Sequence, residues 1–135
     1  MSISSKVFYQ GKLRTQAIHL NSSNEIITDA PIDNNGKGEA FSPTDLLAAS
    51  LASCALTLMG IKAQSLGFDL EEASADVEKI MESSPRRVSE VKIVFSLKQN
   101  CDDHQRLVLE KTAATCPVAK SLSKDLIQTL SFRWK

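Results

Sequence analysis

The sequence predicts an α+β fold in which two antiparallel sheets pack around a long central helix. Three observations predict this class: short segments of alternating polarity towards both ends, one long uncharged segment between them, and two shorter stretches with helical spacing near the C-terminus. A chain of 135 residues can bury most of its apolar surface in one core. Since no internal repeat or linker is visible, we expect residues 1–135 to form a single domain.

The N-terminal part of the chain predicts a small meander of three strands. Gly11 and Lys12 separate the first two strand-like runs, and the second run alternates in polarity, so we expect a hairpin. A turn rich in asparagine and serine leads to the third run, which a polar loop with two glycines follows. The strands are expected at residues 6–10, 13–20 and 25–28, and the loop at residues 31–40.

A long helix is predicted from Pro43 to about Leu66. Ser42 is placed to cap it, and Pro43 occupies the first helical position, where its missing N–H costs nothing. Gly67 suits the left-handed residue that ends a helix. Residues 46–61 carry no charge but fall short of the roughly 18–20 apolar residues of a bilayer span. We interpret this helix as the buried centre of a soluble domain, with no membrane partner.

The second half of the chain predicts two strands, two short helices and a last strand. The first two strands alternate in polarity and are joined by a turn that contains Pro85. Asp102 and Asp103 would lie in the first turn of the next helix, where negative charge suits the helix dipole. These elements are expected at residues 68–81, 88–98, 102–115, 116–122 and 127–134.

The charge balance excludes two classes of partner. Acidic and basic residues number sixteen each, so the chain lacks the electrostatic footprint of a protein that binds nucleic acid or an anionic membrane. The first thirty residues show no cationic start, apolar core and small-residue cleavage site, which favours a cytoplasmic location. We expect the partner to be a small molecule or another protein.

The three cysteines are the residues that point to chemistry. An odd number of cysteines argues against a framework of structural disulfides. A chain of this length also folds without stabilising disulfides, so we expect any disulfide here to take part in a reaction. Cys54 lies deep in the uncharged helix and Cys116 directly precedes a proline that opens a second helix, which together suggest a thiol redox pair. Cys101 and His104 have a C-x-x-H spacing, but further ligands are missing, so no metal site is predicted.

The two thiols are expected to differ in acidity. Cys54 lies about 18 Å along the helix from its start, too far for the helix dipole to lower its pKa. An adjacent guanidinium is the natural activator, and Arg14 is the candidate, although it is also explained as an ordinary exposed strand residue. Cys116 lies at a helix cap, where N–H groups and the dipole favour a thiolate, so local physics makes Cys116 the more acidic thiol.

The segment from Ser42 to Cys54, followed by Cys116-Pro117-Val118, resembles the OsmC/Ohr family. The resemblance rests on the motif Ser-Pro-x-Asp/Glu-Leu-x-x-Ala-x-x-x-x-Cys with a downstream Cys-Pro-Val. The expected order of helices and strands also matches that of the family along almost the whole chain. The resemblance implies an OsmC-like fold, an intertwined homodimer and two thiol sites at the subunit interface. It also implies an antioxidant enzyme of the stress response that reduces hydroperoxides.

The implied reaction assigns one role to each thiol. Cys54, whose apolar surroundings suit an organic hydroperoxide, would attack the peroxide and become a sulfenic acid. Cys116 would condense with it to form a disulfide, and an external dithiol would restore both thiols. Such a peroxidase needs no flavin, haem or metal cofactor.

The sequence departs from the best-characterised branch of that family at Thr44. There a glutamate anchors the catalytic arginine, and the candidate replacements here are Asp45, turned by about 100° around the helix axis, and Glu39 in the preceding loop. The departure indicates a broader OsmC-like protein, not a dedicated organic hydroperoxide resistance enzyme. It also keeps a second hypothesis open: a non-enzymatic protein that binds a small apolar ligand at the dimer interface or senses redox state.

Overall fold

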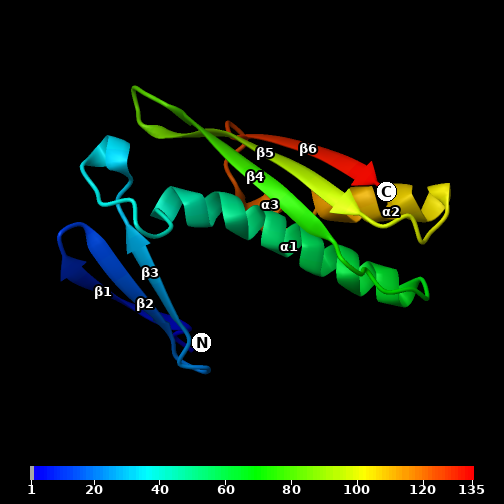
Figure 1. The fold of residues 1–135 in the computed structure, drawn as a ribbon, viewed down its shortest axis with the longest axis horizontal. Coiled ribbons are helices and arrows are strands. Elements are labelled where there is room, and N and C mark those ends of the chain that lie inside the picture. The colour runs from blue at the N-terminus through cyan, green and yellow to red at the C-terminus, as the bar shows by residue number, and fades with distance from the viewer. Residues whose placement is uncertain (1) are drawn as a thin grey trace. The chain divides into compact units, whose positions relative to one another are not determined.

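The computed structural model describes residues 2–135, which form two compact units (Figure 1). The first unit ends at Leu46, and the second runs from Leu47 to Lys135. Each unit contains one three-stranded sheet, and the long helix α1 begins at the end of the first unit. The elements are β1 (Ser5–Gly11), β2 (Arg14–His19), β3 (Glu25–Asp29), η1 (Ile32–Asn34), α1 (Pro43–Ser65), β4 (Ser74–Glu82), β5 (Arg87–Leu97), α2 (Asp103–Ala114), α3 (Pro117–Ser121) and β6 (Ile127–Trp134).

The first unit is the antiparallel meander β1-β2-β3 that the sequence predicts. Lys12 and Leu13 form the tight turn between β1 and β2, and both have positive φ, as two-residue hairpin turns of type I′ require. The pairing of β2 with β3 sets Arg14 opposite Asp29. Asp29 therefore lies beside Arg14, the residue that the sequence offers either as an activator of a thiol or as an ordinary strand residue.

The loop after β3 turns back over the end of that strand. Gly36 lies so close to the strand that a Cβ there would sit 1.7 Å from the carbonyl oxygen of Ala30. Gly38 has a φ of +62° and donates its N–H to the same oxygen at 3.2 Å. Two glycines are needed because the chain approaches its own backbone closely at one and adopts a left-handed conformation at the other.

Helix α1 begins where the sequence predicts. The Ser42 Oγ accepts from the Asp45 N–H at 3.0 Å, while the Asp45 carboxylate accepts from the Ser42 N–H at 3.0 Å, a reciprocal cap. Gly67, at a φ of +92°, follows the last turn, and the Phe68 N–H donates to the Ala63 carbonyl. Because Phe68 still belongs to this cap, the expectation of a strand from residue 68 is wrong, and β4 begins at Ser74.

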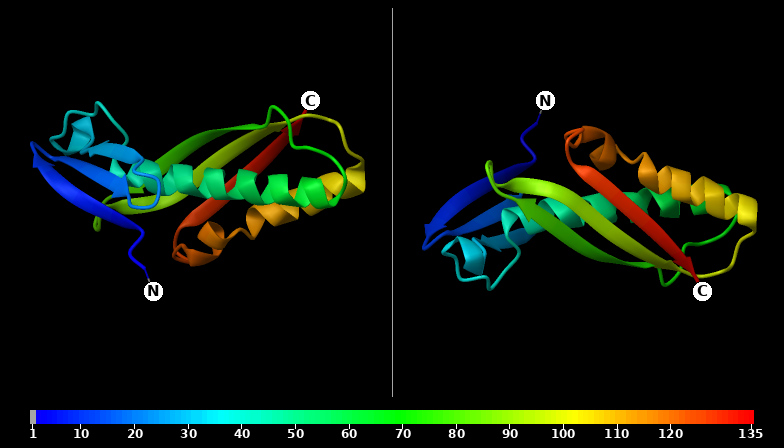
Figure 2. Two further views of the ribbon diagram at one scale, coloured as in Figure 1. Left: turned by 90° about the horizontal axis from the view of Figure 1, so that it is seen from below. Right: turned by 90° about the horizontal axis from the view of Figure 1, so that it is seen from above.

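The sheet of the second unit has the order β4-β5-β6 (Figure 2). Strands β4 and β5 pair antiparallel, whereas β5 and β6 pair parallel. The prediction of two antiparallel sheets is therefore wrong for this one. The reason is the connection: the chain leaves β5, returns through α2 and α3, and can only re-enter the sheet in the same direction as β5.

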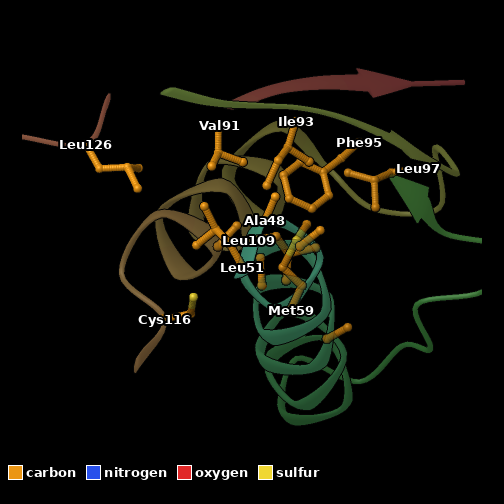
Figure 3. Packing of buried hydrophobic residues seen from close by; sticks show 14 of the residues in the cluster. Ala48, Leu51, Met59, Val91, Ile93, Phe95, Leu97, Leu109, Cys116 and Leu126 are labelled. Atoms are coloured by element: carbon orange, nitrogen blue, oxygen red, sulfur yellow. The ribbon is translucent and has the colours of Figure 1, made fainter. Parts of the chain in front are cut away.

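The core of the second unit lies between this sheet and helices α1 and α2 (Figures 1 and 3). Strand β5 contributes its inward-facing side chains, and the ring of Phe95 stacks on that of Phe132 in β6 at 5.0 Å between centroids. Small residues on α1 allow the neighbouring elements to approach closely. The fully or nearly fully buried side chains of this core include Ala48, Leu51, Ala52, Ala55, Met59, Ala63, Val91, Ile93, Phe95, Leu97, Leu109 and Ala113.

Helix α1 is long and apolar enough to cross a membrane by length and composition alone. Core helices pass the same test, and six of its residues, from Ala48 to Ala63, are buried in the core of the second unit. About a third of its most apolar window, 33%, is buried within the chain. These contacts favour the interpretation of α1 as a core helix.

Candidate functional site

The second unit brings Cys54 and Cys116 together. Cys54 comes from the middle of α1, and Cys116 is the N-cap residue of α3, at the helical side of the core (Figure 3). Both pack at the same hydrophobic core, and Cys54 lies near enough to raise the pKa of Cys116, although the two are far apart in the sequence. Both are free thiols, with Cys54 half-buried and Cys116 only 1% exposed. The arrangement provides two sulfur atoms at close range, one accessible and one enclosed.

The local sequence explains how each thiol is held. Cys54 lies on α1 with its side chain partly buried against the hydrophobic core. Pro117 starts α3, and the Cys116 sulfur accepts a hydrogen bond from the Ala119 N–H at 3.5 Å. Cys116 thus takes the capping position that serine or aspartate more often fills.

Burial raises the pKa of the Cys116 thiol. The Ala119 and Val118 N–H groups act in the opposite direction, and the Cys54 side chain raises the pKa further. The expectation that the helix cap would favour the thiolate of Cys116 is therefore wrong. Its helix has only five residues, and removal of the thiol from water outweighs the cap.

In the first unit, Arg14 is held by two carboxylates. Its Nε donates to Asp29 Oδ1 at 2.7 Å and its Nη2 to Asp29 Oδ2 at 2.8 Å. The same Nη2 donates to Glu39 Oε1 at 3.2 Å. These contacts leave Nη1 as the amino group that neither carboxylate engages. The hydrogen bond to Asp29 raises the pKa of Arg14, and the hydrogen bond from Arg14 lowers the pKa of Asp29.

The predicted supporting carboxylates lie in different places. Glu39 contacts Arg14, as described, and its backbone N–H also donates to Asp29 Oδ2 at 3.1 Å. Asp45 caps α1 through Ser42, and the Thr44 hydroxyl lies 3.1 Å from the Ser42 hydroxyl. Asp29, the carboxylate with the best geometry, was not a candidate from the sequence. The signal for it was available, because in the hairpin register Asp29 lies opposite Arg14.

Cys101 lies apart from these groups, one residue before the N-cap of α2. Asp102 forms that cap with Gln105, each side chain accepting from the other's backbone N–H. Burial raises the pKa of Cys101, and Arg106 opposes the shift. Among residues 2–135, no group of three His, Cys, Asp or Glu side chains could hold a metal ion.

Comparison with known proteins decides the family. The family model described as OsmC-like protein matches residues 36–130, most of the chain, including Cys54 and Cys116. The chain belongs to the OsmC-like protein family. No curated protein matches it.

Solved structures agree with the OsmC-like fold. A Psychrobacter arcticus protein, described provisionally as an osmotic stress induced and detoxification response protein, is 56% identical over 98% of this chain and 97% of its own, with a TM-score of 0.95. An OsmC-like protein from Mycoplasma pneumoniae is 14% identical, covers 99% and 97% of the two chains, and has a TM-score of 0.82. An organic hydroperoxide resistance protein from Legionella pneumophila is 17% identical, with 98% of both chains covered and a TM-score of 0.72. The last two show a shared fold.

The OsmC-like fold explains why residues from distant segments meet in the second unit. Helix α1 carries Cys54 along one side of the core, and the crossover from β5 to β6 brings Cys116 back to it. The two thiols come from elements that are far apart in the sequence. The pair is therefore a product of the fold, and local motifs can indicate the two cysteines but cannot show how they meet.

Proposed function

We propose that this OsmC-like protein is a thiol peroxidase that reduces organic hydroperoxides through Cys54 and Cys116. The observation that carries the proposal is that two free thiols from distant segments meet at one hydrophobic core, with Cys116 enclosed in it and Cys54 packed against it. The Cys54 side chain also contributes to the raised pKa of Cys116, which supports their proximity. Relatives of this fold include organic hydroperoxide resistance proteins, which supports the same class of substrate.

The first step is attack of the Cys54 thiolate on one oxygen of the hydroperoxide. The O–O bond breaks, the sulfur is oxidised to a sulfenic acid, and the alkoxide leaves and takes a proton to become the alcohol. Cys54 is suited to this step because it is the more exposed of the two thiols. Cys116, with its raised pKa, keeps its proton and does not compete for the peroxide.

The second step is attack of the Cys116 sulfur on the sulfenic sulfur of Cys54. The S–O bond breaks, water leaves, and the disulfide forms. An external dithiol then reduces this disulfide by two successive exchange reactions, and is itself oxidised to a disulfide. One hydroperoxide and one dithiol are thereby converted into one alcohol, one water and one oxidised dithiol.

The proposal gives Arg14 the task of stabilising charge on the reacting sulfur and oxygen. A guanidinium stays protonated at any physiological pH, and its planar donors suit an oxyanion. Nη1 is the part of Arg14 that Asp29 and Glu39 leave for this purpose. Removal of one donor from an oxyanion site lowers the rate by a factor of roughly 100 to 1,000 in well-studied enzymes.

We also propose that the protein acts as a homodimer. Strand β1 is exposed along almost its whole length, including both faces, which is unusual for a strand with large apolar side chains. The exposed apolar residues of the first unit are Ile3, Val7, Phe8, Tyr9, Leu13, Leu20, Ile26, Ile32 and Phe41. Such a surface fits burial against a second copy. Light scattering coupled to gel filtration would give the mass, and a monomer would contradict this part of the proposal.

The proposed function is tested by peroxide consumption with defined variants. Cumene hydroperoxide and hydrogen peroxide are each supplied with dihydrolipoamide or dithiothreitol, and the native protein is compared with Cys54→Ser, Cys116→Ser and Cys101→Ser. We expect Cys54→Ser to abolish turnover and sulfenic acid formation. Cys116→Ser should still form the sulfenic acid, which dimedone would trap, but should lose formation of the disulfide. Cys101→Ser is the matched control and should resemble the native protein.

A second candidate function is redox sensing without catalysis. Enclosure of Cys116 favours it, because a disulfide formed inside the core is hard for an external dithiol to reach. A sensor would form the Cys54–Cys116 disulfide once on exposure to peroxide and keep it. The two functions are separated by adding dithiol after one oxidation: a peroxidase returns to two thiols within seconds to minutes, whereas a sensor stays oxidised.

A further inference from the structure

We infer that Gln128 is a positioning residue for Cys116, which it holds in place through the short helix α3; the inference rests on the proposed peroxidase function. The Gln128 Nε2 donates a hydrogen bond to the Ala119 carbonyl at 2.9 Å. The N–H of the same Ala119 donates to the Cys116 sulfur at 3.5 Å. One residue of α3 therefore links the thiol that would close the disulfide to strand β6, and all three residues lie in the second unit.

Gln128 is the polar residue on the inward face of β6. Side chains along this strand alternate between exposed and half-buried positions, and Gln128 shares the half-buried face with Leu130, Phe132 and Trp134. Those three apolar side chains pack against the core of the second unit. An amide on such a face loses contact with water, so it needs a hydrogen-bond partner. The Ala119 carbonyl is that partner.

The Ala119 carbonyl in turn needs a donor from outside its helix. Helix α3 has only five residues, Pro117–Ser121, so its last carbonyls have no N–H four residues further along the same helix. The chain is extended at Leu122, whose N–H still donates to the Val118 carbonyl at 3.2 Å. The next carbonyl, that of Ala119, takes its donor from the Gln128 side chain. The contact thus replaces a hydrogen bond that a longer helix would make.

Helix α3 depends on contacts with the rest of the unit. Isolated helices shorter than about 12 residues are marginal in water. The Lys120 N–H donates to the Cys116 carbonyl at 3.0 Å, and the Ser121 hydroxyl donates to the Pro117 carbonyl at 2.7 Å. These bonds fix the shape of the helical turn but not its place on the sheet. The hydrogen bond from Gln128 crosses to α3 from the start of β6 and so ties the turn to the sheet (Figure 2).

The place of α3 matters for the second proposed step. A disulfide needs sulfur atoms about 2 Å apart and a dihedral angle near 90°, so the Cys116 sulfur has to approach Cys54 within a narrow range of directions. Val118 and Leu122 pack against the core, but apolar contacts are not directional and let a helix shift. The hydrogen bond from Gln128 is directional. We therefore expect it to raise the effective concentration of the Cys116 thiol at the Cys54 sulfur, without changing the attack of Cys54 on the peroxide.

The test measures the two chemical steps separately in the full chain. Reduced protein reacts with cumene hydroperoxide, the reaction is quenched at intervals, and intact mass spectrometry distinguishes thiol, sulfenic acid and disulfide. Attack limits the reaction at low peroxide concentration, and closure of the disulfide limits it at high concentration. Gln128→Met keeps the length of the side chain but removes the donor. It should slow closure by about 3- to 10-fold, the effect expected for one neutral hydrogen bond, and leave attack within about twofold of native.

A second measurement needs no peroxide. Equilibration with mixtures of reduced and oxidised dithiothreitol gives the stability of the Cys54–Cys116 disulfide. In Gln128→Met the equilibrium should shift towards the dithiol by about 3- to 10-fold, because the disulfide then has to confine a helix that the reduced protein leaves loose. Thr129→Val is the matched control, since it removes a hydrogen bond from Thr129 Oγ1 to Glu90 Oε2, 2.6 Å long, on the outward face of β6. It should change neither the rate of closure nor the equilibrium.

Each outcome decides the inference. Slower closure with unchanged attack and a shifted equilibrium support it. Native closure in Gln128→Met, an unshifted equilibrium or an equal loss in Thr129→Val overturns it while the peroxidase function stands. If circular dichroism shows that Gln128→Met does not fold, Gln128→Asn, whose amide is one methylene too short to reach Ala119, decides by the same criteria. If the native protein reduces no peroxide, the proposed function is overturned, and the dithiothreitol equilibrium alone decides whether Gln128 positions Cys116.

Discussion

The buried Cys116 and the half-buried Cys54 pack at the same hydrophobic core, although they come from distant segments of the chain. Burial raises the pKa of the Cys116 thiol, and the Cys54 side chain raises it further, so both effects favour the protonated form of Cys116. Cys54 is the more exposed of the two thiols. These differences agree with the roles that the OsmC/Ohr resemblance implies, in which Cys54 attacks the peroxide and Cys116 forms the disulfide with it.

A stoichiometric pulse of cumene hydroperoxide should convert the reduced protein into a form with a Cys54–Cys116 disulfide. Both thiols pack at the same hydrophobic core, and Cys54 lies near enough to influence the pKa of Cys116. Mass spectrometry of alkylated peptides would identify the linked pair and leave Cys101 free. A disulfide that includes Cys101, or oxidation of Cys54 beyond the sulfenic acid without any disulfide, would contradict the assignment.

The stability of the reduced protein should fall as the pH rises into the alkaline range. The folded-state pKa of Cys116 lies above its value in the unfolded chain, so the group stabilises the fold below the ordinary cysteine pKa of about 8.5. That stabilisation is lost as the pH rises through the folded-state value, because the unfolded chain then releases its proton first. Cys101 contributes with the same sign.

Urea unfolding of reduced protein between about pH 7.5 and 10 would measure this dependence. The Cys116→Ala variant should show a shallower decline than the native protein, and Cys101→Ala a smaller change of the same kind. Parallel slopes for the native protein and Cys116→Ala would show that the Cys116 thiol is not shifted.

Acid should remove the stabilisation that the ionised Asp29 carboxylate gives to the folded protein. The hydrogen bond from Arg14 is the largest cause that lowers the pKa of Asp29 in the folded protein. The ion pair therefore stabilises the fold at pH values above the unfolded-state pKa of about 3.9. This stabilisation is lost as the pH falls through the folded-state pKa. Native protein should therefore lose stability below about pH 4 more steeply than Asp29→Asn. If the two proteins have the same acid unfolding profile, the ion pair does not contribute.

Leu51→Ala should destabilise the fold by roughly 2–5 kcal/mol, because it removes a fully buried side chain where α1 packs into the core of the second unit. Leu107→Ala, at a side chain on α2 that is 66% exposed, is the matched control and should change stability by less than about 0.5 kcal/mol. Equilibrium denaturation of both variants gives the comparison. Equal effects would mean that the buried face of α1 is not where the structure has it.

Much of the fold follows from local signals in the sequence. Ser42 and Pro43 mark the start of α1, Gly67 marks its end, and alternation of polarity finds the strands to within a few residues, except that β4 begins at Ser74. These signals are local because caps and periodicity depend on neighbouring residues. The direction of β6 was missed because it depends on the path of a crossover, not on the strand's own residues.

The site was less accessible from the sequence, for related reasons. The pKa of Cys116 depends on burial by distant elements, so its helix-cap position gave the wrong direction. Asp29 was missed because the predicted third strand ended at Thr28, one residue short of the position opposite Arg14. A third strand extended by one residue would have placed Asp29 opposite Arg14.

The most direct test of the proposed function is the number of cumene hydroperoxide molecules that one protein chain reduces when dihydrolipoamide is present in excess. We predict many turnovers per chain for the native protein and none for Cys54→Ser, with alcohol formed in equal amount to the peroxide consumed. Reduction that stops at one peroxide per chain, or that continues unchanged in Cys54→Ser, would contradict a catalytic role for the Cys54–Cys116 pair.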